Sequence, residues 1–302
     1  MAFGFDLAAL PAYTDQLSLD LISKVVLKTD LLDYVDLRSG FSSGSVAINL
    51  VDAELPVSAL SCGWTSDGQV VYTQVNVTID SLQSKTEMCV EDLRAKYTSA
   101  FMNPGTGNDF IPFEEVISES YADKLRKYNE GYLINGAGAA GTGTGLKAQI
   151  TSANGANLQA GVPAAWTAAN AVEQALDLYD AIAESVKDRD DLIMVVSPDA
   201  YRALVRGLVA SNLFHFDSVN SNDIMILPGT NVTVIKSSGL VGSDYKFAGP
   251  GKMILAATGL TDELDTFRFF YDEAADVMRF RAAWRLGIGV GEVNLFGTND
   301  LA

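Results

Sequence analysis

The sequence has few of the residues that build metal sites and nucleophilic active sites. Its 302 residues include only two cysteines, Cys62 and Cys89, and one histidine, His215. The cysteines do not form a CxxC pair and the histidine is far from both, which argues against a zinc site. His215 is also the only histidine that could act as a base for a nucleophile. We therefore expect no metal, no cofactor and no catalytic residue.

Basic residues are also scarce. The chain has 21 Lys and Arg against 38 Asp and Glu, a net charge of −17. The cationic excess that neutralises phosphates in nucleic-acid-binding proteins is missing, so tight binding to bare DNA is disfavoured. No basic region precedes an apolar run at the N-terminus, and the longest uncharged stretch, residues 148–172, is rich in polar side chains. We expect a soluble protein that does not enter a membrane.

Two kinds of hydrophobic pattern indicate an α+β fold. Val75, Val77 and Ile79 alternate with polar residues, as in a strand, within a long segment whose Asp67-Gly68 pair predicts a turn. Helical spacing predicts a long helix over residues 114–133, with apolar positions at Ile117, Tyr121, Leu125, Tyr128 and Tyr132. A second helix is predicted from Trp166 to Val186.

Further strands are predicted in the second half of the chain. The run "LIMVV", residues 192–196, is typical of a buried strand, and Ser197-Pro198 is typical of a helix start. The β-rich C-terminal part includes a predicted hairpin that turns at residues 273–276.

A glycine-rich segment, "NGAGAAGTGTG", follows the long helix. It contains a literal G-x-G-x-x-G at Gly136, Gly138 and Gly141. Dinucleotide-binding proteins place this motif between a strand and a helix N-terminus, whereas here a helix precedes it and no helical pattern follows. We interpret the segment as the end of a helix. A nucleotide-binding enzyme that uses residues 136–141 is the less favoured alternative.

The order of these elements resembles that of the major capsid proteins of tailed double-stranded DNA bacteriophages, which share the Hong Kong 97-like fold. Five segments carry the resemblance: "VTIDSLQSKTEMCVEDLRA", "FEEVISESYADKLRKYNEGYLINGAG", "LIMVVSPDAYRALVRGL", "ILPGTNVTVIKSSGL" and "FRFFYDEAADVMRFRAAWRLGIGV". The first is similar to the end of the family's extended loop, and the next resembles its spine helix with a glycine exit. The third resembles a recurrent strand-cap-helix segment, and the last two resemble closing strands.

The resemblance implies a division of the chain into four parts. These are an N-terminal arm (1–36), an extended β-loop (37–85), a peripheral domain with the spine helix (86–162 and 265–302) and an axial domain (163–264). The extended loop would lie across a neighbouring subunit. Its expected inter-subunit contacts are Trp64, Val71, Tyr72 and Val75.

The resemblance also implies a structural function. Copies would assemble as pentamers and hexamers into an icosahedral shell around double-stranded DNA, in the host cytoplasm, and remain in the virion. A portal protein and a separate scaffolding protein are the expected partners, because the arm begins close to Met1. An encapsulin-type nanocompartment, which shares the fold, is the nearest alternative.

Overall fold

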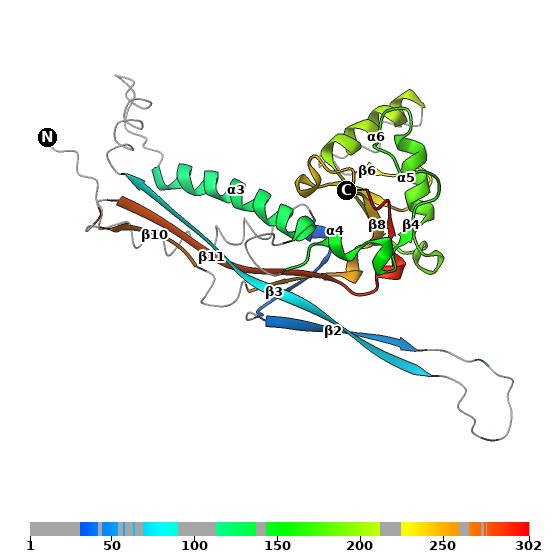
Figure 1. Cartoon of the computed structure of the whole chain (residues 1–302), viewed down its shortest axis with the longest axis horizontal. Helices are drawn as coiled ribbons and strands as arrows, with labels where there is room; N and C mark the ends of the chain where they lie inside the picture. The colour runs from blue at the N-terminus through cyan, green and yellow to red at the C-terminus, as the bar shows by residue number, and fades with distance from the viewer. Residues whose placement is uncertain are drawn as a thin grey trace.

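The computed structural model describes residues 31–41, 44–53, 57, 63, 69–89, 113–136, 143–211, 225–259, 266–272, 275 and 277–301. These residues form a mixed α+β structure with two six-stranded sheets and a long two-stranded ribbon that projects from the body (Figure 1). Residues 1–30 of the predicted arm, Trp64 and His215 lie outside the described residues. None of the helices in the described parts is long and apolar enough to cross a membrane.

The first sheet is built around the long strand β11 (Val277–Val290). Its order is β1 (Asp36–Ser39), β9 (Ile254–Thr258), β11, β3 (Val70–Cys89) and β2 (Gly44–Ala53), with β10 (Thr266–Asp272) also paired to β11. β1 and β9 are parallel, and the other pairs are antiparallel. Asp272 pairs with Val277, so the predicted hairpin is confirmed.

β3 belongs to two different structures along its length. From Cys89 to Ile79 it pairs with β11, whereas residues 70–78 pair only with β2. The two-stranded ribbon therefore consists of β2 and the first part of β3. Both ends of the segment predicted as an extended loop, at β1 and at residues 79–85, lie within the first sheet.

The second sheet has shorter strands. Its order is β4 (Asn157–Leu158), β12 (Gly297–Thr298), β8 (Phe247–Pro250), β5 (Leu192–Val196), β7 (Thr233–Lys236) and β6 (Met225–Ile226). β5 is buried at every position, as its apolar run predicts. β4 and β12 come from outside the predicted 163–264 unit, while β9, inside that range, belongs to the first sheet.

The predicted long helix is confirmed as α3 (Phe113–Asn135), which lies along the first sheet (Figure 1). Tyr121 stacks on Phe280 of β11, with ring centroids 4.3 Å apart. Further along, the indole Nε1 of Trp284 donates to Asn129 Oδ1 at 2.9 Å. Leu125 is buried in the same core, so its helical spacing marks the face that packs on the sheet.

Two helices cover one face of the second sheet. α5 (Ala171–Asp180) and α6 (Pro198–Ala210) share a core with Leu192, Met194 and Val196 of β5. The alternate β5 residues, Ile193 and Val195, belong to the other core, which includes the C-terminal part of α3 and the short helix α4 (Leu146–Gln149). The second sheet thus lies between two apolar layers.

The start of α6 is as predicted, whereas α5 is shorter than predicted. Ser197 caps α6, because its Oγ accepts from Ala200 N at 3.3 Å. The predicted helix over 166–186 was too long at both ends. Asn170 Oδ1 accepts from Thr167 N at 2.7 Å and holds a turn ahead of α5. At the other end, the non-helical backbone of Ala183 prevents the helix from continuing to Val186.

Short 3-10 helices connect several of these elements. They are η1 (Leu32–Tyr34), η2 (Ser152–Asn154), η3 (Glu184–Val186), η5 (Ser238–Leu240), η6 (Gly251–Met253) and η7 (Val293–Leu295). η1 lies at the end of the predicted arm, and both Leu31 and Leu32 are buried in the core that surrounds α3. The end of the arm is therefore anchored in the body of the protein.

Candidate assembly surfaces

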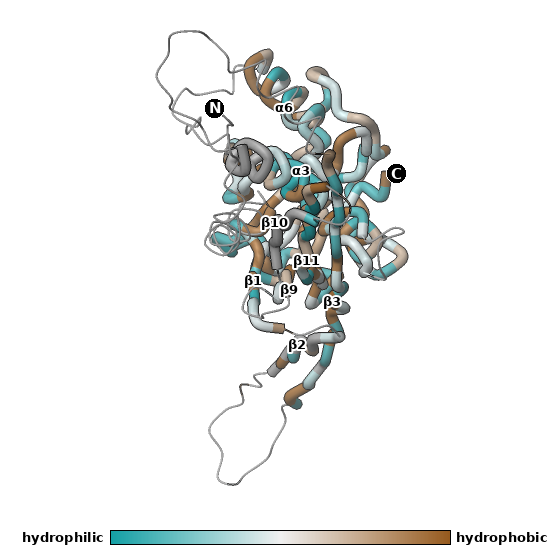
Figure 2. The backbone as a smooth tube through the Cα atoms, turned by 90° about the vertical axis from the view of Figure 1, so that its left-hand side faces the viewer, coloured by the Kyte–Doolittle hydropathy of each residue, from teal (hydrophilic) through white to brown (hydrophobic). Residues whose placement is uncertain are grey.

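The ribbon of β2 and residues 70–78 of β3 exposes large apolar side chains. Tyr72 is 75% exposed, Val51 59%, Val70 50% and Val71 47%. Figures 1 and 2 show the ribbon extending away from the rest of the protein, with hydrophobic residues at the described end of β3. An isolated two-stranded ribbon is marginally stable in water, so this surface is suited to burial against another chain.

Strand alternation divides the predicted contact residues between the two faces of the ribbon. Val71 and Val75 lie on one face and Tyr72 on the other, because successive side chains of a strand point to opposite faces. Val51 pairs with Tyr72 and shares its face. Val51 and Val70 were not predicted as contact residues. The apolar run "VAINLV", which ends at Val51, was the signal that could have indicated the first of them. Trp64 lies outside the described residues, and Val75 is half-buried.

The root of the ribbon, by contrast, is tightly packed. Val77 and Ile79 are 1% and 3% exposed. A Cβ on Gly289 of β11 would come within 2.3 Å of Val77 Cγ2, and one on Gly287 within 2.4 Å of the Thr78 carbonyl oxygen. The glycines of "LGIGV" thus allow β3 to lie close against β11 where the ribbon leaves the sheet.

A buried carboxylate connects this root to the long helix. Asp80 is 8% exposed, and its Oδ2 accepts from the Tyr132 hydroxyl at 2.9 Å and from Gly143 N at 2.6 Å. The Tyr132 hydroxyl also lies 3.2 Å from the carbonyl oxygen of Leu286. Burial, followed by the hydrogen bond to Asp80, raises the pKa of Tyr132, so this hydroxyl stays protonated. β3, α3, β11 and the glycine-rich segment therefore meet at one hydrogen-bonded junction.

In its described residues, the glycine-rich segment allows two parts of the backbone to pack closely against each other. Gly136 directly follows α3 with φ of +88°, as in a helix C-terminus. A Cβ on Gly145 would lie 2.3 Å from both Gly136 N and Ile134 O. A helix precedes Gly136, as predicted, so this glycine lacks the preceding strand of a dinucleotide site. The prediction that no helix follows was wrong, because the short helix α4 begins directly after Gly145. Gly138 and Gly141 lie outside the described residues.

A second buried carboxylate joins α3 to the second sheet. Glu130 is 2% exposed and accepts from Ser237 Oγ at 2.7 Å, from Ser238 N at 3.0 Å and from Ser238 Oγ. A Cβ on Gly239 would lie 2.7 Å from the Glu130 carbonyl oxygen, so the chain after β7 approaches the helix closely. Hydrogen bonds to an ionised group are stronger than neutral ones, which suits a fixed joint between the two sheets.

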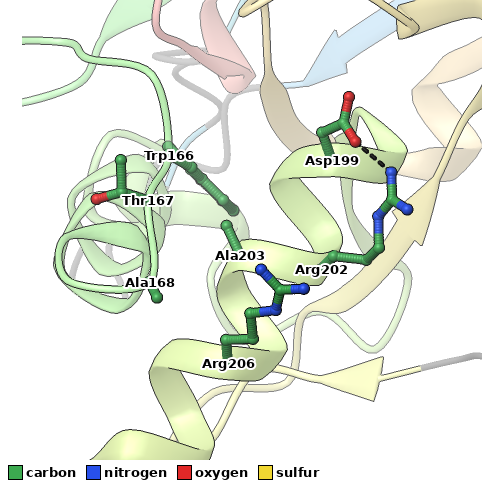
Figure 3. Close-up of a pocket in the computed structure, with 7 residues that line it drawn as sticks. All are labelled: Trp166, Thr167, Ala168, Asp199, Arg202, Ala203 and Arg206. Atoms are coloured by element: carbon green, nitrogen blue, oxygen red, sulfur yellow. Dashed lines mark hydrogen bonds and ion pairs between the residues drawn. The ribbon is translucent and has the colours of Figure 1, made fainter.

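A cleft of about 520 Å³ lies between residues 166–168 and α6. Trp166, Thr167 and Ala168 line one side, opposite four residues of α6: Asp199, Arg202, Ala203 and Arg206 (Figure 3). Arg202 is paired with Asp199, whereas Arg206 has no ion pair among the described residues. The cleft therefore offers positive charge beside an aromatic ring on a protein that is acidic overall.

Comparisons with known proteins identify the fold. No protein-family model and no curated protein matches the sequence. Among solved structures, the chain is similar to the capsid of an empty GTA particle, with 14% identity, a TM-score of 0.60 and coverage of 89% of this chain and 88% of that one. It is also similar to a chain of the satellite phage P4 procapsid that includes the size determination (Sid) protein, with 8% identity, a TM-score of 0.61 and coverage of 92% and 89%.

A non-phage particle matches as well. The holo-SrpI encapsulin complex of Synechococcus elongatus is 11% identical, with a TM-score of 0.55 and coverage of 90% of this chain and 86% of that one. At these identities the likeness establishes the fold. The chain therefore has the fold of capsid and encapsulin shell proteins, and the resemblance inferred from the order of its sequence elements is confirmed at that level.

Proposed function

We propose that the chain is the major capsid protein of a tailed bacteriophage and assembles through its ribbon into a closed shell. The observation that carries this proposal is the projecting ribbon, with Tyr72 and Val51 exposed on one face and Val71 on the other. A single subunit leaves this apolar surface in water. A neighbouring copy that covered it would supply the burial that a two-stranded ribbon lacks.

The parts of the chain have corresponding roles in this proposal. In this proposal residues 37–85 are the extended loop that lies on a neighbouring subunit, and Trp64 is one of its contact residues. The first sheet with α3 forms a peripheral domain, and the second sheet with α5 and α6 forms an axial domain around the centre of each pentamer or hexamer. The bonds of Asp80 and Glu130 hold the ribbon and the second sheet to α3.

The net charge of −17 is consistent with a container that encloses double-stranded DNA without gripping it. With only 21 Lys and Arg in the chain, few cations are available to bind phosphates, so retention of the genome would depend on closure of the shell. A scaffolding protein and a portal complete the assembly pathway, which takes place in the host cytoplasm and ends in the virion. The similar satellite phage procapsid includes a size determination protein, which supports an assembly partner of this kind.

An encapsulin-type compartment is the second candidate, favoured by the similarity to the encapsulin complex. Such a shell encloses protein cargo. Nuclease treatment of purified particles, followed by extraction, separates the two functions. Protected double-stranded DNA of defined length supports the phage capsid, and DNA-free particles with co-purifying protein support the compartment.

The role of the ribbon is tested by replacing Tyr72 with serine. This change removes a 75% exposed ring, so the isolated subunit should melt as the wild type does while the yield of particles falls. Asn76→Ser is the matched control, because Asn76 is also exposed and lies on the same face of β3. A particle yield for Tyr72→Ser equal to that of Asn76→Ser would remove the ribbon from the assembly mechanism.

A further inference from the structure

The outward face of α5 carries an acidic stripe. Glu173 and Asp180 are exposed and Asp177 is half-buried, while Leu176, 40% exposed, lies between them. The spacing 173, 176, 177 and 180 places these side chains on one face of the helix, away from the buried Ala171, Gln174, Ala175 and Leu178. None of the three carboxylates has an ion pair within the described residues.

The outward face of α6 carries a net positive charge, because two arginines outnumber the one carboxylate, Asp199. Arg202 and Arg206 are exposed one helical turn apart, and Val209, 57% exposed, continues the same stripe. Arg202 is held by Asp199, whereas Arg206 has no ion pair in the described part of the chain. Arg206 also lines the cleft beside Trp166 and Ala168 (Figure 3).

The two stripes do not neutralise each other within one subunit. α5 and α6 meet through other residues: a Cβ on Gly207 would lie 2.9 Å from Ala168 O and 3.1 Å from Val172 Cγ2. α5 packs over β12 and β8, whereas α6 packs over β7, towards the opposite edge of the sheet. The acidic stripe is thus nearer the β4 edge and the basic stripe nearer the β6 edge.

We propose that the acidic stripe of α5 in one copy docks on the basic stripe and cleft of α6 in the next copy. This inference rests on the proposed function, because it names the partner of this surface as a second copy of the chain. Each stripe combines charge with one exposed apolar side chain, Leu176 on α5 and Val209 on α6. Stripes near opposite edges of the sheet favour a head-to-tail contact, which closes into a ring when the rotation per subunit is suitable.

The charge of the whole chain favours such a contact. Copies that each carry −17 repel one another, so association requires either apolar burial or local pairing of opposite charges. Placing Glu173 against Arg206 provides the pairing, and complementary charges also fix the orientation of neighbours. The contact should weaken as salt rises, because exposed charges are screened.

Charge reversal tests this contact. Arg206→Glu should leave the melting curve unchanged and weaken self-association in sedimentation velocity by about tenfold or more. Adding Glu173→Arg to that variant restores opposite charges across the contact and should recover most of the association. The matched control is Arg206→Glu with Asp188→Arg, which has the same net charge but reverses a carboxylate outside the stripe and should recover nothing.

The outcomes separate this contact from the proposed shell. Specific rescue by Glu173→Arg supports the contact, whether the oligomers are closed shells or only small rings in electron micrographs. Small rings without shells would contradict the capsid function alone. The contact is overturned if Arg206→Glu associates like the wild type, if both compensating changes rescue equally, or if the wild type remains monomeric.

Discussion

Removal of the Asp80 carboxylate should loosen the root of the ribbon. Asp80 Oδ2 accepts from Tyr132 and from Gly143 N, and hydrogen bonds to a charged group contribute about 1.5–3 kcal/mol each. Without Asp80, the Tyr132 hydroxyl can still donate to the carbonyl oxygen of Leu286, 3.2 Å away. Gly143 N would lose its hydrogen bond to Asp80, so most of the lost stability comes from this bond. Asp80→Ala should therefore lower the free energy of unfolding by about 3 kcal/mol.

A double-mutant cycle isolates the bond between the two side chains. Tyr132→Phe should lower the free energy of unfolding by only about 1–1.5 kcal/mol, because Asp80 keeps its hydrogen bond from Gly143 N. The double variant should be more stable than the sum of the single losses predicts, with a coupling energy of about 1–2 kcal/mol. Urea unfolding of the unassembled subunit measures all three values. Tyr128→Phe is the control, because Tyr128 is 43% exposed and its change should cost little.

The same hydroxyl makes a prediction about pH. Burial and Asp80 raise the pKa of Tyr132 above its ordinary value in the folded chain. Above a pH of about 10 the unfolded chain loses this proton while the folded chain keeps it, so stability should fall as pH rises. The fall should be shallower in Tyr132→Phe, although buried Tyr245, whose pKa is also raised, leaves a remainder. Two results together would contradict the bond between Asp80 and Tyr132. One is that the losses of unfolding free energy add in the double-mutant cycle, and the other is that Tyr132→Phe loses stability above pH 10 as steeply as the wild type.

Three further changes test the core and the glycine-rich segment. Leu125→Asp should lower the free energy of unfolding by about 3 kcal/mol or more, since it leaves an unpaired charge in the core around α3; a wild-type melting temperature would contradict the packing of this helix. Gly145→Ala should cost about 1–3 kcal/mol, because its Cβ would meet backbone atoms at 2.3 Å; a calorimetric unfolding measurement that showed no loss would argue against close packing there. Burial lowers the pKa of Lys246 to about 8, so between pH 8 and 10 the unfolded chain holds a proton that the folded chain has lost, and stability from this group should rise with pH. Lys246→Met should abolish that rise in urea titrations, and an identical pH profile would show that the ammonium group is not desolvated.

Local patterns in the sequence predicted the elements that depend on local physics. The apolar spacing around Leu125 marked α3, and Ser197-Pro198 marked the start of α6, because helical periodicity and capping are short-range effects. The residues that flank positions 273–276 likewise predicted the hairpin of β10 and β11. The order of these elements was enough to indicate the capsid-protein fold.

Features that depend on distant parts of the chain could not be predicted. Asp80 meets Tyr132 and Gly143 across separations of 52 and 63 residues, and no local signal distinguishes it from other strand carboxylates. The places of β4 and β12 in the second sheet, and of β9 in the first, also depend on pairing between distant residues. α5 was predicted too long because the side chain of Asn170 competes with the helical pattern ahead of it.

Electron microscopy of the full chain tests the central claim most directly. The protein would be imaged in negative stain after expression alone and after co-expression with a candidate scaffolding protein. The proposed function predicts closed angular shells of uniform size in at least one preparation. Small globular particles in both preparations, at concentrations where the subunit is folded, would contradict it.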